Sequence, residues 1–261
     1  MARQQIDVKD FGLFVEVVRS AARLVESAKV GIGPGGLEIY GAHSNIARCE
    51  LTSNAVSSAS PVEFSVESLQ MLLRVATSAK EAHEGGDMSG LRFFVDGPFV
   101  RFESKKIKTK MATVGEAVIS RWVSKKITTE MRPVFEFVSN SEMIKKVNSH
   151  SFMFSSPKDA RVYVETVPDM ENNAVFATLG NRETDLNNEV TLKFGLVTSG
   201  ALGDGRGIIL DLERLNLFNA VQSGEIRFQL MDLNCLVGRA SLSGRDGAFF
   251  NMSVYSTLLK S

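Results

Sequence analysis

Glycines at one point of the sequence have a spacing that could bind a dinucleotide. The segment 29–36 contains Gly31, Gly33 and Gly36 in the order G-x-G-x-x-G. In a dinucleotide-binding fold such glycines lie between a strand and the N-terminus of a helix, where backbone amides face the pyrophosphate. Here they follow an expected helix and lead into an expected strand, 37–41. This order favours a hairpin turn, in which glycine supplies positive φ, over a nucleotide site.

The histidines, cysteines and carboxylates form no pattern typical of a metal or catalytic centre. None of the three histidines has a metal-ligand spacing to a cysteine or a carboxylate. The sequence contains no Gly-x-Ser-x-Gly elbow and no H-E-x-x-H motif. Glu183, Asp185 and Glu189 cluster in one segment, which is more typical of a solvated loop than of a metal site. We therefore expect no enzymatic activity, no cofactor and no metal; an enzyme with scattered catalytic residues, which leaves no local motif, is the alternative.

Composition narrows the class of protein further. The chain has 261 residues and a formal net charge of zero, so any basic surface must be segregated from acidic ones. Cys49 and Cys235 both lie in apolar, strand-like runs, which indicates a reducing compartment and no disulfide framework. No apolar run is long enough to span a bilayer, and the first ten residues are too polar for a signal peptide. We expect a soluble, cytoplasmic protein without a membrane partner.

One stretch, 60–103, shows how the elements are ordered. Its apolar residues first alternate over 62–66, as in a strand, and then take helical spacing at Leu69, Leu72, Leu73, Ala76 and Ala79. The turn residues 96–98 then separate two short runs that predict a hairpin. The stretch therefore predicts a strand, a helix and two further strands.

The same order recurs along the chain. The strand-to-helix junctions fall near residues 9, 66, 138 and 211, after the strands expected at 4–8, 62–66, 134–138 and 207–210. Asp10 is the expected N-cap of the first helix, and 139–142 has the S-x-x-E spacing of a capping box. We expect another strand at 152–155 and the last helix at 211–221. This repetition predicts an internally duplicated architecture with two domains of two units each.

A linker separates the two expected domains. Residues 1–111 form the expected N-terminal domain, 112–132 the linker, and 133–261 the C-terminal domain. The linker contains Trp122, the sole tryptophan, which either fixes the linker or borders a binding surface.

Each expected helix has a polar row opposite its apolar stripe, and such rows are usually solvated faces. Arg19 and Arg23 lie one turn apart, so their side chains project side by side. The formal charges of the four helical segments 10–26, 67–82, 139–150 and 211–221 are about −1, 0, +1 and −1. Acidic residues at the first turns, which cap a helix or favour its dipole, account for part of this acidity: Asp10, Glu67, Glu142 and Asp211.

A lysine strip follows the second unit. Lys106, Lys108 and Lys110 alternate in the sequence, so they share one face if this segment is a strand. The strip either protects the edge of a sheet by charge or contacts phosphates.

Two segments of the chain resemble DNA sliding clamps. VEFSVESLQMLLRVATSAK at 62–80, and GIILDLERLNLFNAVQSGEIRFQL at 207–230 with the later GAFFNMSVYST, are similar to the strand-helix-strand units of clamps from T-even-type bacteriophages and of proliferating cell nuclear antigen. The resemblance covers nearly the whole chain. It implies a duplicated two-domain α+β clamp fold of four strand-helix-strand units, with helices lining a ring and sheets outside.

The resemblance also implies a function. Such a ring encircles double-stranded DNA, tethers a DNA polymerase as a processivity factor, closes as a homotrimer and is loaded by an ATP-dependent clamp loader. Cations on the inner helices meet phosphates without reading bases. By position, the resemblance assigns this role to Arg19, Arg23, Arg74, Lys80, Lys145, Lys146 and Arg214.

The family also holds partner peptides in a hydrophobic pocket near the linker and the C-terminus. By position alone, the resemblance assigns to this pocket Gly41, His43, Ile46, Trp122, Tyr255 and Leu258. Purely structural roles, such as ending a strand pair, explain several of these residues equally well.

Two alternatives without catalysis remain. A monomeric processivity factor of the herpesvirus kind holds DNA by charge, which requires a strongly basic face and fits poorly with zero net charge. A duplicated α+β interaction module would have no DNA role at all.

Overall fold

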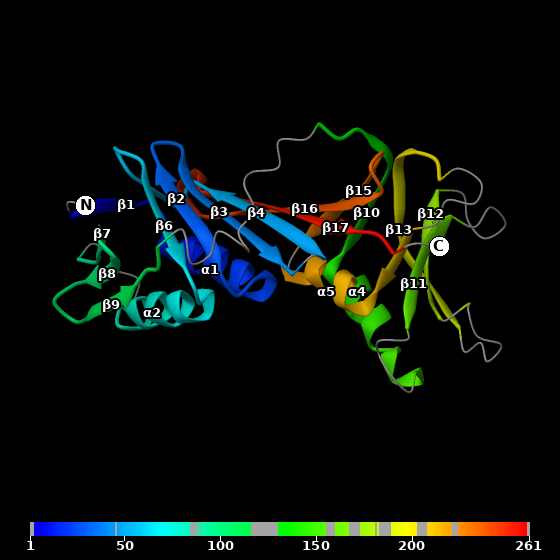
Figure 1. Ribbon diagram of the computed structural model, residues 1–261, viewed down its shortest axis with the longest axis horizontal. Helices are drawn as coiled ribbons and strands as arrows, with labels where there is room; N and C mark the ends of the chain where they lie inside the picture. The colour runs from blue at the N-terminus through cyan, green and yellow to red at the C-terminus, as the bar shows by residue number, and fades with distance from the viewer. Residues whose placement is uncertain are drawn as a thin grey trace. The chain divides into compact units, whose positions relative to one another are not determined.

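The structure of the protein, a computed structural model, describes residues 3–44, 46–83, 88, 90–115, 130–154, 160–166, 173–180, 182, 189–202, 208–220 and 224–259 (Figure 1). The chain divides into two compact units. Unit 1 comprises 1–127 and 241–252, and unit 2 comprises 128–240 and 253–261. The domain limits expected from the sequence stay a prediction.

Antiparallel strands in two sheets form the scaffold of unit 1. One sheet has the order β5-β1-β7-β8-β9, whose strands span Val56–Ser57, Gln4–Val8, Arg92–Asp96, Phe99–Glu103 and Lys108–Ala112. In the other, β4, β3, β2 and β6 are adjacent in that order and span Ala47–Ser53, Gly36–His43, Ala28–Gly33 and Val62–Val66. Residues 241–252 join this unit, where the N–H of Phe249 donates to Asn54 Oδ1 at 2.7 Å.

Two helices lie on one side of these strands in unit 1 (Figure 1). They are α1, Phe11–Leu24, and α2, Leu69–Glu81, which confirms both expected helices. The apolar stripe of α1 faces the core, where the rings of Phe11, Phe14, Phe93 and Phe102 contact one another with centroids 4.7–6.2 Å apart. Gln70 Nε2 of α2 donates to Ala22 O of α1 at 3.1 Å, so the two helices lie side by side.

The glycine fingerprint forms the hairpin between β2 and β3, as expected. Gly33 pairs with Gly36 at the turn, and Gly36 has φ +119°. A Cβ at Gly36 would lie 2.2 Å from Ser53 O, so no other residue fits there without moving the neighbouring strand. The glycines thus serve strand pairing.

Unit 2 is built mainly of strands in the order β14-β11-β12-β13-β10-β15-β16-β17. Their bounds are Ile208–Asp211, Arg161–Thr166, Ala174–Gly180, Val190–Gly200, Pro133–Asn140, Glu225–Met231, Cys235–Ser243 and Phe249–Thr257. Helices α4, Ser141–Asn148, and α5, Leu212–Leu217, lie on one side of this sheet (Figure 1). The core contains Phe137, whose ring stacks on Phe228 at 4.8 Å and 9°.

Two helix starts differ from the expectation. Ser139 is not the N-cap of α4, because it still belongs to β10 and its hydroxyl donates to Phe194 O. Asn140 is the cap instead, and its side chain accepts from the N–H of Met143 at 3.0 Å. Likewise Glu67 precedes α2, whose cap is Ser68.

Two further expectations were wrong in the second half of the chain. The strand expected at 152–155 is a 3-10 helix, Ser151–Met153, because i→i+3 hydrogen bonds continue beyond the end of α4. Phe152 is 81% exposed there. The last helix is also shorter than expected, since α5 ends at Leu217 and a second 3-10 helix, Phe218–Ala220, follows.

Candidate nucleic-acid interface

Four side-chain caps fix where each helix begins and therefore which of its residues face solvent. Asp10, Ser68, Asn140 and Asp211 each accept a hydrogen bond from the backbone N–H three residues later, at 2.7–3.3 Å. Such a cap satisfies one of the unpaired amides of the first turn. The helix therefore starts in an equivalent way in all four strand-helix-strand repeats, as the repeated pattern predicts.

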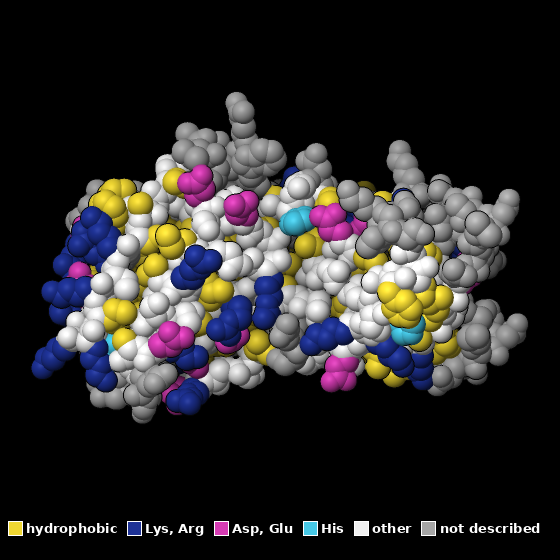
Figure 2. Space-filling model, turned by 90° about the horizontal axis from the view of Figure 1, so that it is seen from below, with side chains coloured by type: hydrophobic (Ala, Val, Ile, Leu, Met, Phe, Trp, Pro, Cys, Tyr) yellow, Lys and Arg dark blue, Asp and Glu magenta, His cyan; other side chains and the backbone are white. Residues whose placement is uncertain are grey.

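The polar rows of unit 1 contain four of the predicted DNA-binding cations. Arg23 on α1 and Arg74 and Lys80 on α2 are exposed. Arg19 is partly exposed and forms an ion pair with Glu16 one turn earlier. Figure 2 views the molecule from the side of the helices and shows Lys and Arg side chains there with acidic side chains among them. This face is mixed in charge, in agreement with the formal charges of the segments.

Unit 2 offers fewer exposed cations on its helices. Lys145 and Lys146 of α4 are both exposed. Arg214 of α5 differs, because its side chain is only 14% exposed. Its guanidinium forms an ion pair with the cap residue Asp211 and donates to Thr257 O at 3.0 Å. Arg214 therefore contributes to the start of α5 and has the least access to a phosphate among the predicted cations.

The arrangement suits weak contacts with a uniform polyanion. Flexible cations on neighbouring helices can neutralise phosphates without reading base edges. Carboxylates among them lower the attraction, so these helices would hold DNA only loosely.

The predicted partner-peptide residues are divided between the two units. Gly41, His43 and Ile46 lie in unit 1, where a Cβ on Gly41 would lie 2.5 Å from Val25 Cγ2 and His43 Nδ1 lies 3.1 Å from Leu24 O. Tyr255 and Leu258 lie in unit 2 and are partly exposed. Trp122 lies outside the described residues. The pocket stays a prediction.

His83, Cys49 and Cys235, which are residue types that catalysis often uses, are buried or partly buried. His83 is 6% exposed, and its Nδ1 lies 2.9 Å from Ala79 O at the end of α2. Burial raises the pKa of Cys49 to about 12 and that of Cys235 to about 11, so both are neutral thiols at physiological pH. Within the described ranges, no group of three or more His, Cys, Asp or Glu side chains could hold a metal ion. No helix there is both long and apolar enough to cross a membrane.

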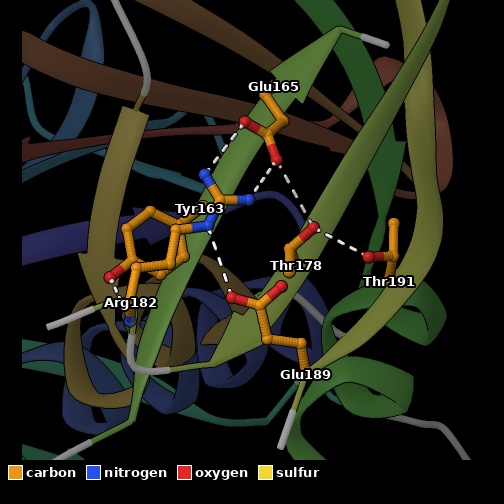
Figure 3. A network of polar contacts seen from close by, with 6 residues as sticks. All are labelled: Tyr163, Glu165, Thr178, Arg182, Glu189 and Thr191. Atoms are coloured by element: carbon orange, nitrogen blue, oxygen red, sulfur yellow. Dashed lines mark hydrogen bonds and ion pairs between the residues drawn. The ribbon is translucent and has the colours of Figure 1, made fainter. Parts of the chain in front are cut away.

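Glu189 of the predicted acidic cluster contacts an arginine (Figure 3). Arg182 donates to both carboxylate oxygens of Glu165, at 2.6 and 3.3 Å, and its Nε lies 3.5 Å from Glu189. Its guanidinium also covers the ring of Tyr163, and the hydrogen bonds that it donates to Glu165 raise the Arg182 pKa. Glu183 and Asp185 lie outside the described residues. Arg182 therefore links Glu189 to Glu165 of β11.

A second group of cations gathers on the five-stranded sheet of unit 1. The lysine strip, Lys106, Lys108 and Lys110, was predicted from the sequence, whereas the arginines of β7 and β8 and the one before β1 were not. In the sequence, Arg92 is followed at every second position by Phe94 and Asp96, and Arg101 lies two residues from both Phe99 and Glu103. The strand register that brings them together is not visible there.

Comparison with known proteins gives a match at the level of structure alone. No protein-family model and no curated protein matches the sequence. The crystal structure of proliferating cellular nuclear antigen from Entamoeba histolytica matches with a TM-score of 0.69 and 13% identity, over 99% of this chain and 98% of that chain. The structure of A. fulgidus PCNA with the bound C-terminal region of FEN-1 matches with a TM-score of 0.69 and 12% identity, over 100% and 99%. The chain therefore has the α+β fold of the PCNA-like sliding clamps.

Proposed function

We propose that this protein is a sliding clamp: a homotrimeric ring that encircles duplex DNA and tethers a DNA polymerase as a processivity factor. The observation that carries the proposal is the fold match over essentially the whole chain, which includes all four strand-helix-strand units. An ATP-dependent loader would open and close the ring, and the clamp itself would catalyse no reaction.

The solvent faces of the helices support the DNA contact. Each unit presents exposed cations on its helices, such as Arg23 in unit 1 and Lys145 in unit 2. Because acidic residues lie among them, the attraction per helix is small. A closed ring needs little affinity, since the DNA cannot leave it sideways. Weak contact and topological retention are therefore compatible in this proposal.

An open sheet edge supports assembly. β9 is the last strand of the five-stranded sheet, and in the described part of the chain it pairs with β8 alone. An edge strand with a free row of backbone N–H and C=O groups can pair with another chain. Closure of a ring by such pairing makes each interface heterologous, as cyclic assemblies require.

Particle mass and retention on DNA test the proposal together. Light scattering should give three chains per particle, and the particle should remain on circular DNA but slide off the same DNA once it is linearised. One chain per particle with equal binding to both DNAs would support the monomeric, charge-held alternative. One chain per particle without DNA binding would support the interaction module.

Charge reversal tests the predicted inner face. Arg19→Glu with Arg23→Glu should slow loading or reduce processive synthesis and leave particle mass unchanged. The matched control is Arg227→Glu with Arg239→Glu, which changes the net charge equally at two exposed arginines paired across β15 and β16. Equal processivity of the inner-face variant and the parent would show that the assignment of this face is wrong.

A further inference from the structure

The five-stranded sheet of unit 1 has one face away from its helices, and cations dominate it. Core side chains such as Phe93 and Phe102 point toward α1, so their neighbours along β7 and β8 point the other way. We call this surface the cationic face. Its positive members are Arg3, Arg92, Arg101, Lys108 and Lys110, and the exposed Lys105 and Lys106 lie in the turn that leads into β9. Its carboxylates are Asp7, Asp96 and Glu103.

The strand register turns these residues into ordered rows. Phe94, Arg101 and Lys110 are directly opposite one another across β7, β8 and β9. In the neighbouring row, Arg92 and Lys108 flank Glu103. Lys108 and Lys110 are two residues apart on one strand, so they rise along it by about 7 Å. The cations therefore lie along and across the strands.

Aromatic rings support some of these cations. Arg3 Cζ lies 3.8 Å from the centroid of Phe94, and Lys110 Nζ lies 3.5 Å from the centroid of Phe99. A cation over a ring face is attracted by the ring quadrupole, which restrains the side chain. Because Arg3 and Lys110 lie over the rings of Phe94 and Phe99, these two places on the face present positive charge instead of apolar surface.

Carboxylates neutralise only part of the face. Arg3 pairs with Glu103 at 2.7 Å, and Arg101 pairs with Asp96 at 2.9 Å. Arg92 and the lysines of the strip are exposed, and within the described ranges no ion pair involves them. A surplus of exposed positive charge remains.

Protection of a sheet edge explains only part of this surface. Lysines on the outermost strand, such as Lys108 and Lys110, do discourage unwanted pairing of β9. Arg92 and Arg101 lie on β7 and β8, which have neighbours on both sides, so edge protection gives no reason for them. The face as a whole requires another account.

The chemistry of the face favours a phosphate backbone over an acidic protein. Protein interfaces have an apolar, often aromatic, centre from which lysine is depleted. The most exposed large apolar side chains of the described residues lie elsewhere, at Met71, Val134, Phe152, Leu196, Leu233 and Phe249. Rows of Lys and Arg without such a centre suit a uniform polyanion.

We propose that the cationic face binds the phosphodiester backbone of nucleic acid, at a surface separate from the helices. The binding is independent of sequence, because the cations contact phosphates and the aromatic rings are not free for base stacking. A strand held here lies on the sheet side of unit 1 and needs no enclosure by a ring.

Short oligonucleotides test this face without any topological retention. Lys108→Gln with Lys110→Gln removes two cations and leaves polar, slightly shorter side chains. The matched control is Arg227→Gln with Arg239→Gln in unit 2, and Arg23→Gln with Arg74→Gln reports on the helices. Anisotropy is measured with a labelled single strand and a duplex of about 20 nucleotides at about 0.05–0.2 M salt.

We expect the lysine variant to bind the single strand roughly 20-fold more weakly at about 0.1 M salt, with the salt slope reduced by about 1.4. For a duplex the slope should fall by about 1.8. A loss in either arm supports the proposal, and the form that the parent protein binds more tightly is the preferred one. A loss no greater than that of the unit 2 control, in both arms, overturns it.

A second lysine variant and a competing peptide are added to the oligonucleotide-binding experiment. Lys105→Gln with Lys106→Gln changes the turn before β9 and should weaken binding in the same direction even if changes within β9 disturb folding or assembly. An acidic peptide that displaces the oligonucleotide at equal charge and lower concentration would overturn the proposal in favour of a protein partner. Particle mass and retention on circular DNA are recorded for each variant, so failure of the ring is distinguished from failure of this face.

Discussion

The two units repeat one order of elements with helices of very different length. In unit 1, α1 and α2 have 14 and 13 residues, whereas α4 and α5 of unit 2 have 8 and 6. The aromatic core follows this difference. In unit 1, α1 supplies Phe11 and Phe14 beside two rings from strands, whereas in unit 2 the strands supply all the clustered rings except Phe218 of the 3-10 helix.

The shorter helices of unit 2 thus go with a larger share of core rings from the strands. A helix of four turns has room for an apolar stripe and a separate polar row, so α1 packs on the sheet and still exposes Arg23. A helix of six residues has little room for both, and its one arginine, Arg214, is engaged with its own cap and with Thr257 O. The long helices therefore provide more of the exposed charge proposed to face DNA.

Truncation of one central ring in each unit should give the largest effects. Phe14→Ala and Phe137→Ala each remove a ring that contacts three others, and each should cost about 3–5 kcal/mol of stability. Phe14 attaches a helix, so its loss should raise amide hydrogen exchange throughout α1. Phe137 lies on β10, which is hydrogen-bonded on both sides, so exchange should rise in the strands of unit 2.

The control for these variants is Phe152→Ala, at a side chain that is 81% exposed. It should leave stability within about 0.5 kcal/mol of the parent. Unchanged exchange of α1 in the Phe14→Ala protein would contradict the view that the helix is held mainly by its own rings.

The helix caps should give a smaller difference between the units. Asp10 accepts from the N–H of Leu13 and also from the N–H of Arg245, both at 2.9 Å. Asn140 caps α4 through the N–H of Met143. Asp10→Ala should therefore cost about 2 kcal/mol, and Asn140→Ala about 1 kcal/mol, in urea unfolding. Asp10→Asn, which keeps the capping oxygen, should fall between them; equal losses for the two alanine variants would refute the added role of Asp10.

Local pattern was sufficient for most of the fold. Apolar periodicity located α1 and α2, and the turn signals located the hairpins, because these features depend on neighbours in sequence. Two predictions failed for different reasons, one through a tertiary contact and one through local hydrogen bonding. Ser139 has the right spacing for a capping box, but its hydroxyl bonds to Phe194 O on another strand. The strand expected at 152–155 became a 3-10 turn because the end of α4 continues its hydrogen bonding.

The candidate sites were harder to predict than the fold. Exposure of Arg23, Arg74 and Lys145 follows from helical periodicity, which the sequence contains. The engagement of Arg214 does not, since it depends on Thr257, 43 residues away. The cationic face was missed for the same reason, because Arg101 and Lys110 become neighbours only through strand register.

The smallest difference between the units concerns their cysteines at alkaline pH. Burial raises the pKa of Cys49 in unit 1 from 9.0 to about 12, and that of Cys235 in unit 2 from 9.0 to about 11. A raised pKa means that the folded state disfavours the thiolate. The resulting stability is fully present below pH 9 and is lost as pH rises from there toward the raised values. Neutral conditions should therefore show no difference.

Thiol labelling can resolve this difference between the units. At pH 9 the thiolate fraction of the folded chain should be roughly tenfold lower for Cys49 than for Cys235, so iodoacetamide should modify Cys235 first. Cys49→Ala should also make the unfolding free energy fall less steeply above pH 9 than in the parent. Mass spectrometry of the labelled peptides gives the order. If Cys49 reacted first, β4 would open more readily than β16, and unit 1, despite its longer helices, would be the less stable of the two.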